Sequence, residues 1–338
     1  MIPEIVVGID VSKNELACSL CDRTQRPLAQ RTFPNTAEGV AQIARWARPE
    51  AAWVLEPTGR YSLQAVAHGR AAGRTVLLAP PREAKQFLRS LNVRAKTDTI
   101  DSAGLALFAL SRPLRPYPLR TEVHEEIAQL VKTRKSLSKA LATMSQQCRS
   151  MPYSKSVLEP AMAAIRAQMR QADVRLGQLV RTSPELSSAR QLARIHGVGP
   201  VTAAAVASCL SARDFTHPDQ FVAFIGLDVR VVQSGGSSSN RGLTKHGDAE
   251  LRRLLYCCAQ SSLRSRGSPF VMQYEREREK GLSTTAALCA VARKMARVCW
   301  AIHARKVAYD PERVYHRPPR SDVAEVVAQS DEQANVGA

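Results

Sequence analysis

A short apolar run ends in an acid at residues 5–10, Ile5-Val6-Val7-Gly8-Ile9-Asp10. The pattern returns at residues 51–56, Ala51-Ala52-Trp53-Val54-Leu55-Glu56. Apolar runs of this length, bounded by polar residues, predict buried strands. Further strands are predicted at 16–20, around Phe33 (a short one) and at 75–78, and helices at 36–47, 61–72 and 98–110. Three strands followed by alternating helices and strands predict a mixed α/β sheet, covered by helices, in residues 1–118.

Two segments with heptad spacing come next. Their apolar positions are Ile127, Leu130, Leu137, Leu141, Met144 and Cys148 in the first, and Leu158, Met162, Ile165, Met169, Ala172, Leu176 and Leu179 in the second. This alternating 3,4 spacing is typical of a coiled-coil seam. We therefore expect a helical hairpin over residues 119–185, paired either within the chain or across a dimer. Arg134 also lies on the seam, where it fits only if it pairs with an acid or a phosphate.

Residues 186–312 are predicted to be mainly α-helical. His196-Gly197-Val198-Gly199-Pro200 separates two helical segments, as in a helix-hairpin-helix element. Gly197 and Gly199 either bind a phosphate there or form an ordinary tight turn. Asp248 is expected to cap a helix that buries its leucines and exposes Arg252 and Arg253. A helix over residues 284–307 is expected to expose Arg293, Lys294, Arg297 and Arg305, and residues 313–338 are expected to form a disordered tail.

Positive charge is concentrated in two segments. The chain has 338 residues and a formal charge of +18. Residues 126–181 contribute +7 and residues 241–306 contribute +9. Clustered cations of this kind favour nucleic acid as the partner over a merely solvated surface, because they displace counterions from phosphate backbones.

Several classes of protein are excluded by composition. The 44% of apolar residues argues against disorder of the whole chain. No apolar run reaches the length of about 18 residues that would span a membrane. The first residues lack the features of a signal peptide, and the eight cysteines lack the paired spacing of a zinc site. We expect a cytoplasmic protein with reduced thiols.

Four carboxylates in the first region stand out by position. Asp10 and Glu56 each end a predicted strand, and Asp98 and Asp101 lie on one face at the start of a helix. Acids that converge at strand ends repel one another unless a cation lies between them. Mg²⁺ suits such a set, because it takes oxygen ligands and bridges to substrate phosphates. Taken singly, an acid at a strand end is usually a solvated terminus, and Asp98 alone would more often be a helix cap.

Ser234 is a second candidate for chemistry. We interpret residues 230–247 as an irregular, mobile loop that contains Gln233-Ser234-Gly235-Gly236. A basic cluster, Arg241, Lys245 and His246, follows the serine in sequence and suits attack on a phosphodiester, and Arg230 before it is a further candidate for binding nucleic acid. The same Ser/Gly-rich composition is also typical of a flexible linker.

An ordered set of motifs resembles one family of insertion-sequence transposases, the bridge-RNA-guided family with a RuvC-like (ribonuclease H fold) amino-terminal domain. The motifs are Val7-Gly8-Ile9-Asp10, Glu56-Pro57-Thr58-Gly59, Lys96-Thr97-Asp98-Thr99-Ile100-Asp101, His196-Gly197-Val198-Gly199-Pro200, Gln233-Ser234-Gly235 and Lys245-His246-Gly247-Asp248. The resemblance spans about residues 5–310. It implies a bacterial cytoplasmic enzyme that associates with the nucleoid when active.

This resemblance implies residue roles and partners. Asp10, Glu56, Asp98 and Asp101 would hold Mg²⁺, and Ser234 would attack DNA to form a covalent phosphoserine. Donor and target DNA would be selected by a structured guide RNA, so that the protein grips backbones while the RNA reads sequence. Strand exchange between two duplexes needs several active sites, so we expect a dimer that becomes a tetramer on nucleic acid, with a composite site built from both halves of the chain.

Two other functions remain open from the residues alone. One is a metal-dependent, structure-specific nuclease of the Holliday-junction resolvase type, in which water is the nucleophile and Ser234 belongs to a linker. The other is a non-catalytic RNA or DNA scaffold, which the intact set of four acids argues against. A covalent protein–DNA species would distinguish the transposase from the nuclease.

Overall fold

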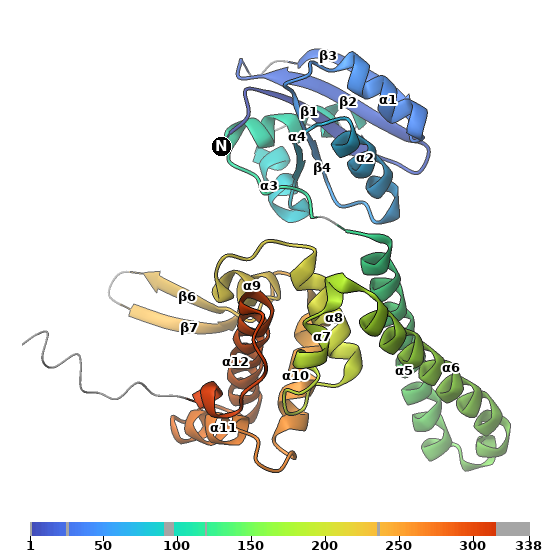
Figure 1. Cartoon of the computed structure of the whole chain (residues 1–338), viewed down its shortest axis with the longest axis vertical. Coiled ribbons are helices and arrows are strands. Elements are labelled where there is room, and N and C mark those ends of the chain that lie inside the picture. Colours follow the sequence, from blue (N-terminus) through green and yellow to red (C-terminus); the bar gives the residue numbers. More distant parts are fainter. Residues whose placement is uncertain (1, 25–26, 91–97, 119, 235–236, 316–338) are drawn as a thin grey trace, which may run out of the picture. The chain divides into compact units, whose positions relative to one another are not determined.

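A computed structural model describes residues 2–24, 27–90, 98–118, 120–234 and 237–315, with the backbone alone for residues 60, 98–99, 230–234 and 237–241. The chain forms two compact units, unit 1 (residues 1–119) and unit 2 (residues 120–338) (Figure 1). Among the described residues no helix is both long and apolar enough to cross a membrane.

Unit 1 is built on a five-stranded mixed sheet, as the sequence predicted. The strands are β1 (Ile5–Val11), β2 (Glu15–Asp22), β3 (Pro27–Pro34), β4 (Ala52–Leu55) and β5 (Val76–Leu78). Their order is β3-β2-β1-β4-β5, with β1 antiparallel to β2 and parallel to β4. β3 is longer than the short strand predicted around Phe33. It is an edge strand whose residues are mostly exposed, so backbone pairing with β2 and not apolar burial defines its length.

Helices cover both faces of this sheet. They are α1 (Ala37–Trp46), α2 (Arg60–Ala71), α3 (Pro81–Ser90) and α4 (Asp98–Ser111). Val7, Ile9 and Trp53 face the side with α1 and α2, whereas Val6 and Val54 pack on the side with α3 and α4. The alternation follows from the two-residue period of a strand. Unit 1 is therefore a three-layer structure, and its strand ends are held in place from both sides.

Unit 2 is mainly helical, as predicted. Its elements are α5 (Glu122–Ser150), η1 (Pro152–Ser154), α6 (Lys155–Thr182), η2 (Pro184–Leu186), α7 (Ala189–Leu192), α8 (Pro200–Ser211), α9 (Pro218–Phe224), β6 (Val229–Ser234), β7 (Ser237–Leu243), α10 (Ala249–Ser262), α11 (Phe270–Glu279), α12 (Thr284–Arg305) and η3 (Glu312–Tyr315). Asp248 caps α10 as expected, because its Oδ1 accepts hydrogen bonds from the amides of Glu250 and Leu251. Most of the predicted tail, residues 316–338, lies outside the described residues.

The helices α5 and α6 run side by side within one chain (Figure 1). Arg134, on the seam, is paired with Asp173 of α6, with Nε 2.5 Å from Oδ1 and Nη2 3.1 Å from Oδ2. A bidentate pair of this kind removes the objection to an arginine in that position. Ile127 of α5 and Leu176 of α6 belong to the main core of unit 2, whereas the seam residues toward the turn of the hairpin are mostly half-buried.

The segment predicted as an irregular loop is instead a two-stranded antiparallel sheet. β6 and β7 pair from Val229↔Leu243 to Ser234↔Ser237 (Figure 1). The prediction was wrong because the serines and glycines at 234–239 are typical of a linker. The β-branched side chains of Val229, Val231 and Val232 supply the strand propensity that this interpretation overlooked.

Candidate active site

The strands β1 and β4 bring two of the predicted acids to the same edge of the sheet. β1 and β4 are parallel neighbours, and their register pairs Ile9 with Leu55. Asp10 follows Ile9 within β1 and Glu56 directly follows the end of β4, so the two acids lie side by side near the carboxyl ends of the strands. Both are half-buried. Asp10 shares a face of β1 with Val6 and Gly8, which is the face covered by α4.

Gly8 lets α4 approach this face closely. A Cβ at Gly8 would lie 1.9 Å from the carbonyl oxygen of Ser102 and 2.7 Å from the amide nitrogen of Ala106. The hydroxyls of Ser19 in β2 and Ser102 in α4, 2.8 Å apart and fully buried, fix the helix in the same place. Asp101, the residue before Ser102, is thereby brought to the end of β1.

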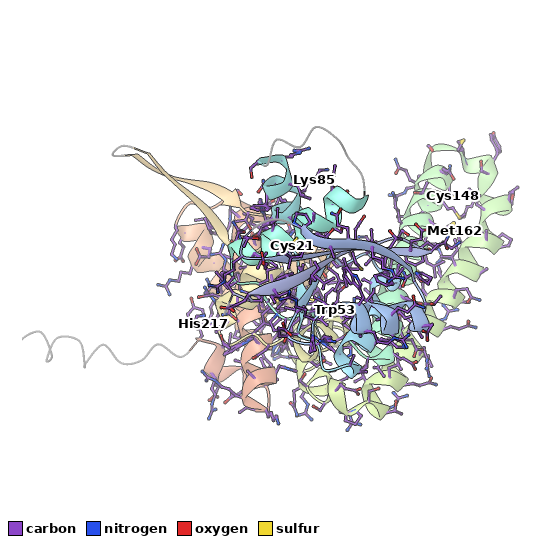
Figure 2. The ribbon with its side chains drawn as sticks, turned by 90° about the horizontal axis from the view of Figure 1, so that it is seen from above. Cys21, Trp53, Lys85, Cys148, Met162 and His217 are labelled. Carbon is purple, nitrogen blue, oxygen red and sulfur yellow. The ribbon has the colours of Figure 1, made fainter. Side chains whose placement is uncertain are left out.

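The electrostatics of Glu56 show that three acids meet there. Burial raises the pKa of the Glu56 carboxyl, and the negative charges of Asp10 and Asp101 raise this pKa further. Lys85 of α3 acts in the opposite direction (Figure 2). Two carboxylates close to a third disfavour its ionised form, which is the expected effect of like charges at short range. The structure thus brings together Asp10, Glu56 and Asp101.

Asp98 begins α4, but its side chain lies outside the described residues. It precedes Asp101 by three residues, a spacing that gives both the same side of a helix. Among the side chains that the structure does describe, no three acidic, histidine or cysteine residues are grouped as a metal site. The donor chemistry nevertheless fits a hard divalent cation, since carboxylate oxygens converge there and repel one another.

Sequence reasoning missed three residues that position this site. Gly8 was recorded only as part of a motif, although a glycine within a strand signals close approach of another backbone. Ser102 and Lys85 gave no signal, because their roles depend on partners distant in sequence. α3 itself was not predicted, since Ala84 is the only residue it buries fully.

Ser234 is the last residue of β6 and pairs with Ser237. Its side chain and those of Arg230 and Arg241 lie outside the described residues. Lys245, which follows β7, is exposed and has a left-handed backbone with φ 55°. A non-glycine residue in this region costs about 1 kcal/mol or more and is enriched at functional sites.

Of the two arginines of α10 that were predicted to be exposed, one is exposed and the other is not. Arg252 is half-buried, and its Nη1 donates to the carbonyl of Ile225 at 3.0 Å. Arg253 is exposed but is paired with Glu250 of the same helix. In α12, Arg293 is half-buried as well and donates to the carbonyl of Leu227 at 3.0 Å. Both long side chains reach back to backbone carbonyls after α9, and the spacing of residues along one helix cannot predict such contacts with another segment.

The glycines of the α7–α8 turn have different roles. Gly197 has φ 84°, and a Cβ there would lie 2.4 Å from the carbonyl oxygen of Cys258 in α10. A Cβ at Gly199 would meet nothing within 4 Å. Gly197 is therefore accounted for by close packing of the turn on α10, whereas Gly199 faces open space at the start of α8.

Comparison with known proteins identifies the family of the chain. Residues 7–151 match the transposase family model of the DEDD, IS110 type, and residues 189–275 match the model "Transposase IS116/IS110/IS902 family". Together the two models cover more than half of the chain, and they define a transposase, an enzyme that acts on DNA. The chain belongs to the IS110 family of transposases.

Distant relatives match almost from end to end. A probable family 20 transposase of Pseudomonas aeruginosa is 24% identical, over 90% of this chain and 98% of its own length. The pilin gene-inverting protein of Moraxella bovis is also 24% identical, over 90% and 97%. The transposase for insertion sequence element IS1328 of Yersinia enterocolitica is 23% identical, over 88% and 96%. Membership of a DEDD transposase family indicates dependence on a divalent metal.

Proposed function

We propose that this chain is an RNA-guided transposase that cuts and rejoins DNA strands through a covalent bond to Ser234. Asp10, Glu56, Asp98 and Asp101 would bind Mg²⁺ on a RuvC-like sheet in unit 1. The observation that carries the proposal is the convergence of Asp10, Glu56 and Asp101 on the α4 face of that sheet, where burial and then the charges of the other two acids raise the pKa of Glu56. Acids that only capped helices or ended strands in solvent would not repel one another in this way.

The proposed strand transfer conserves the number of phosphoester bonds. The Oγ of Ser234 attacks a phosphodiester, a new Oγ–P bond forms and one P–O bond of the strand breaks. The hydroxyl proton leaves Ser234, and the released strand end becomes a hydroxyl. A strand end of the other DNA then attacks the phosphoserine and restores a free serine, so rejoining needs no external energy source.

Serine needs help to react, because its hydroxyl is un-ionised at neutral pH. Bound Mg²⁺ would supply charge neutralisation at the phosphate and a lower pKa for the attacking hydroxyl. The carboxylates of unit 1 that would bind this Mg²⁺ are kept in place by β1, β4 and α4. The basic residues around Ser234, including Lys245, would bind the phosphates on either side of the cut.

Guide RNA and DNA would be held mainly through their backbones. The two basic segments lie in unit 2, where α5, α6, α10 and α12 carry most of their charges. Only 5% of residues are aromatic, which is few for reading unstacked bases by stacking. Sequencing of RNA that copurifies with the protein tests this part. One dominant structured RNA is expected, and a random mixture of cellular RNAs would refute guidance.

For assembly we propose a dimer that becomes a tetramer on nucleic acid. The turn between α5 and α6 exposes apolar side chains, with Tyr153 97% and Val157 77% exposed. A charge at the seam residue Leu176 would unfold the protein instead of testing the interface, because Leu176 is fully buried in the core of unit 2. Tyr153→Asp with Val157→Asp should instead weaken association in sedimentation without loss of fold. An unchanged oligomer would remove the hairpin turn from the interface.

The serine mechanism is tested by Ser234→Ala, with Ser237→Ala as the matched control on the opposite strand. Ser234→Ala should eliminate both recombination and the protein–DNA species that survives denaturing electrophoresis, while RNA binding is unchanged. Ser237→Ala should retain both. If Ser234→Ala still cleaved strands and no covalent species formed with the native chain, the water-using nuclease would be the better account.

A mixed dimer tests whether the two units act together. One chain carries Asp10→Asn and the other Ser234→Ala, so that each lacks one part of the machinery. Recovery of strand transfer at one site would show that acids and serine are supplied by different chains. Loss of all transfer, with both variants still dimeric, would show that each chain supplies its own pair.

A further inference from the structure

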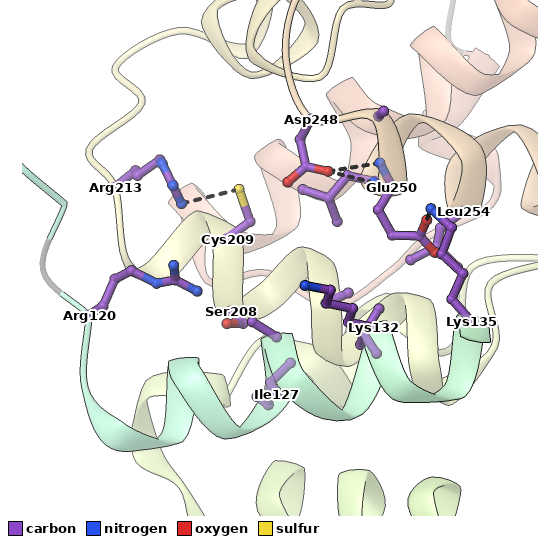
Figure 3. A pocket seen from close by; sticks show the side chains of 15 residues that line it. Arg120, Ile127, Lys132, Lys135, Ser208, Cys209, Arg213, Asp248, Glu250 and Leu254 are labelled. Atoms are coloured by element: carbon purple, nitrogen blue, oxygen red, sulfur yellow. Dashed lines mark hydrogen bonds and ion pairs between the residues drawn. The ribbon is translucent and has the colours of Figure 1, made fainter. Parts of the chain in front are cut away.

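A pocket of about 440 Å³ lies in unit 2 between α5, α8 and α10, away from Ser234 in sequence and not used by the proposed strand transfer (Figure 3). Its floor is apolar and is formed by side chains such as Ile127, Val131 and Leu254. The volume lies within the range of about 300–1,000 Å³ that is typical of small-ligand sites. A floor of this kind suits a planar or aliphatic group that is withdrawn from water.

Cationic side chains surround this floor. Lys132 of α5 and Arg120, which precedes that helix, point their charged groups into the same space, and Arg213 follows α8 at the edge (Figure 3). Lys132 and Arg213 have no carboxylate within 4 Å among the described residues, and Arg120 is paired with Glu125. Arg213 is held by other contacts, with Nη1 3.7 Å from the Cys209 sulfur and its guanidinium over the Phe224 ring.

The acids that line the pocket are already engaged. Asp248 caps α10 through its Oδ1. Glu250 lies between two cations, with its carboxylate 2.6 Å from the Lys135 ammonium and 2.5 Å from the Arg253 guanidinium. The pocket is thus lined by four basic side chains, Arg120, Lys132, Lys135 and Arg213, against two acidic ones, Asp248 and Glu250, which leaves a net positive charge beside its apolar floor. Like charges gathered in this way are stabilised by a bound anion.

We propose that this pocket binds an unpaired nucleotide of single-stranded DNA, with its phosphate at Lys132, Arg120 and Arg213 and its base on the apolar floor. A nucleotide combines the two properties that the pocket offers, an anionic group and a flat, largely apolar face. A base within a duplex is stacked and paired, so it cannot enter without being extruded. No lining residue is aromatic, so the contact should tolerate any base.

DNA is the favoured source because the family acts on DNA, and exchange of strands between two duplexes exposes unpaired nucleotides. The pocket would hold such a strand while its end is transferred. This inference depends on the action on DNA and is independent of the serine mechanism, since binding needs no strand cleavage. A Ser234→Ala background can therefore be used for every measurement.

The electrostatic part is tested by fluorescence anisotropy of a labelled single-stranded DNA across a range of salt concentrations. Lys132→Gln should weaken binding and reduce the slope of log K against log salt by about 0.7, the value for one lost phosphate contact on a single strand. Lys139→Gln is the matched control, because Lys139 lies one heptad further along α5 and outside the pocket. If the two substitutions weakened binding equally, Lys132 would contribute only general surface charge and the proposal would be overturned.

The steric part is tested by photocrosslinking with single-stranded DNA that contains 4-thiothymidine. Crosslinks are expected on peptides of α5, α8 and α10. Ala128→Trp, at an exposed residue that lines the pocket, should abolish them, whereas Ala142→Trp, also exposed on α5, should not. Duplex DNA should give no such crosslinks. If only RNA of the same sequence crosslinked there, or if Ala128→Trp had no effect, the pocket would not be a site for DNA.

Discussion

The candidate catalytic groups of the two units are mounted on different kinds of sheet. Asp10 and Glu56 end neighbouring strands of a five-stranded sheet that has helices on both faces, and α4 brings Asp101 to the same edge. Ser234 ends a strand of a two-stranded sheet, β6–β7. A two-stranded ribbon is marginal by itself, whereas a covered five-stranded sheet is rigid. The acids are thus preorganised by the fold, whereas for the serine we propose that it gains its working position only when nucleic acid binds.

The largest expected effect comes from removing an acid. Asp10→Asn keeps the size of the side chain and removes its charge, so the sheet should stay folded. Recombination should fall about 10³-fold or more, since a metal ligand supplies several kcal/mol of charge stabilisation in the transition state. Nucleic acid binding should be unchanged.

Asp22→Asn is the matched control for this experiment, because Asp22 ends β2 in the same unit and accepts hydrogen bonds from the backbone and hydroxyl of Thr24. It should retain recombination. If Asp10→Asn recombined DNA at the wild-type rate, Asp10 would not belong to the active site and the assignment of the four acids would be wrong.

Proline substitutions compare the two sheets directly. Val232→Pro disrupts β6–β7 at the Val232↔Ser239 pair and should lower recombination about 10²-fold by displacing Ser234. The free energy of unfolding should change little, because the ribbon is a two-stranded sheet of its own. Val54→Pro lies in the buried strand β4, between β1 and β5, and should prevent unit 1 from folding. Circular dichroism and recombination assays on both variants measure the contrast, and global unfolding by Val232→Pro would contradict it.

The sequence predicted the strands that carry the acids better than the segment that carries the serine, for a physical reason. β1 and β4 are buried on both faces, so their apolar runs and the acids that follow them are visible in the sequence. β6 and β7 depend on pairing with each other, and the serine-rich half carries no apolar pattern. The contacts of Arg134 with Asp173 and of Arg252 with Ile225 join residues far apart in sequence, which local periodicity cannot show.

Gly8→Ala tests how precisely the acids are mounted. The added methyl group would overlap the Ser102 carbonyl of α4, so the helix must shift. Overpacking of this kind costs about 1–3 kcal/mol of unfolding free energy, and displacement of Asp101 should reduce recombination as well. Gly199→Ala in unit 2 is the control for stability, because its Cβ would meet no atom. Chemical denaturation of both variants measures the difference, and equal stability would show that α4 does not depend on Gly8.

The smallest effect should come from pH, and it should be confined to unit 2. Burial lowers the pKa of His124. Its Nδ1 accepts the backbone amide hydrogen of Thr121, so the proton of the neutral ring is on Nε2, which donates to Ser211 Oγ at 2.8 Å. A second proton would face the Thr121 amide and is disfavoured. The unfolded chain binds this proton at about pH 6.5 and the folded chain only at lower pH, so stability is full above pH 6.5 and falls as pH decreases below it.

Hydrogen exchange should therefore show loss of protection in α5 and α8 below pH 6.5, with the peptides of unit 1 as the internal reference. His124→Asn should lower stability at pH 7.5 and flatten this dependence, while His68→Asn, at an exposed residue of α2, should leave it unchanged. A profile in which His124→Asn kept the full pH dependence would assign it to another group of unit 2, with His303, whose pKa burial also lowers, as the next to substitute.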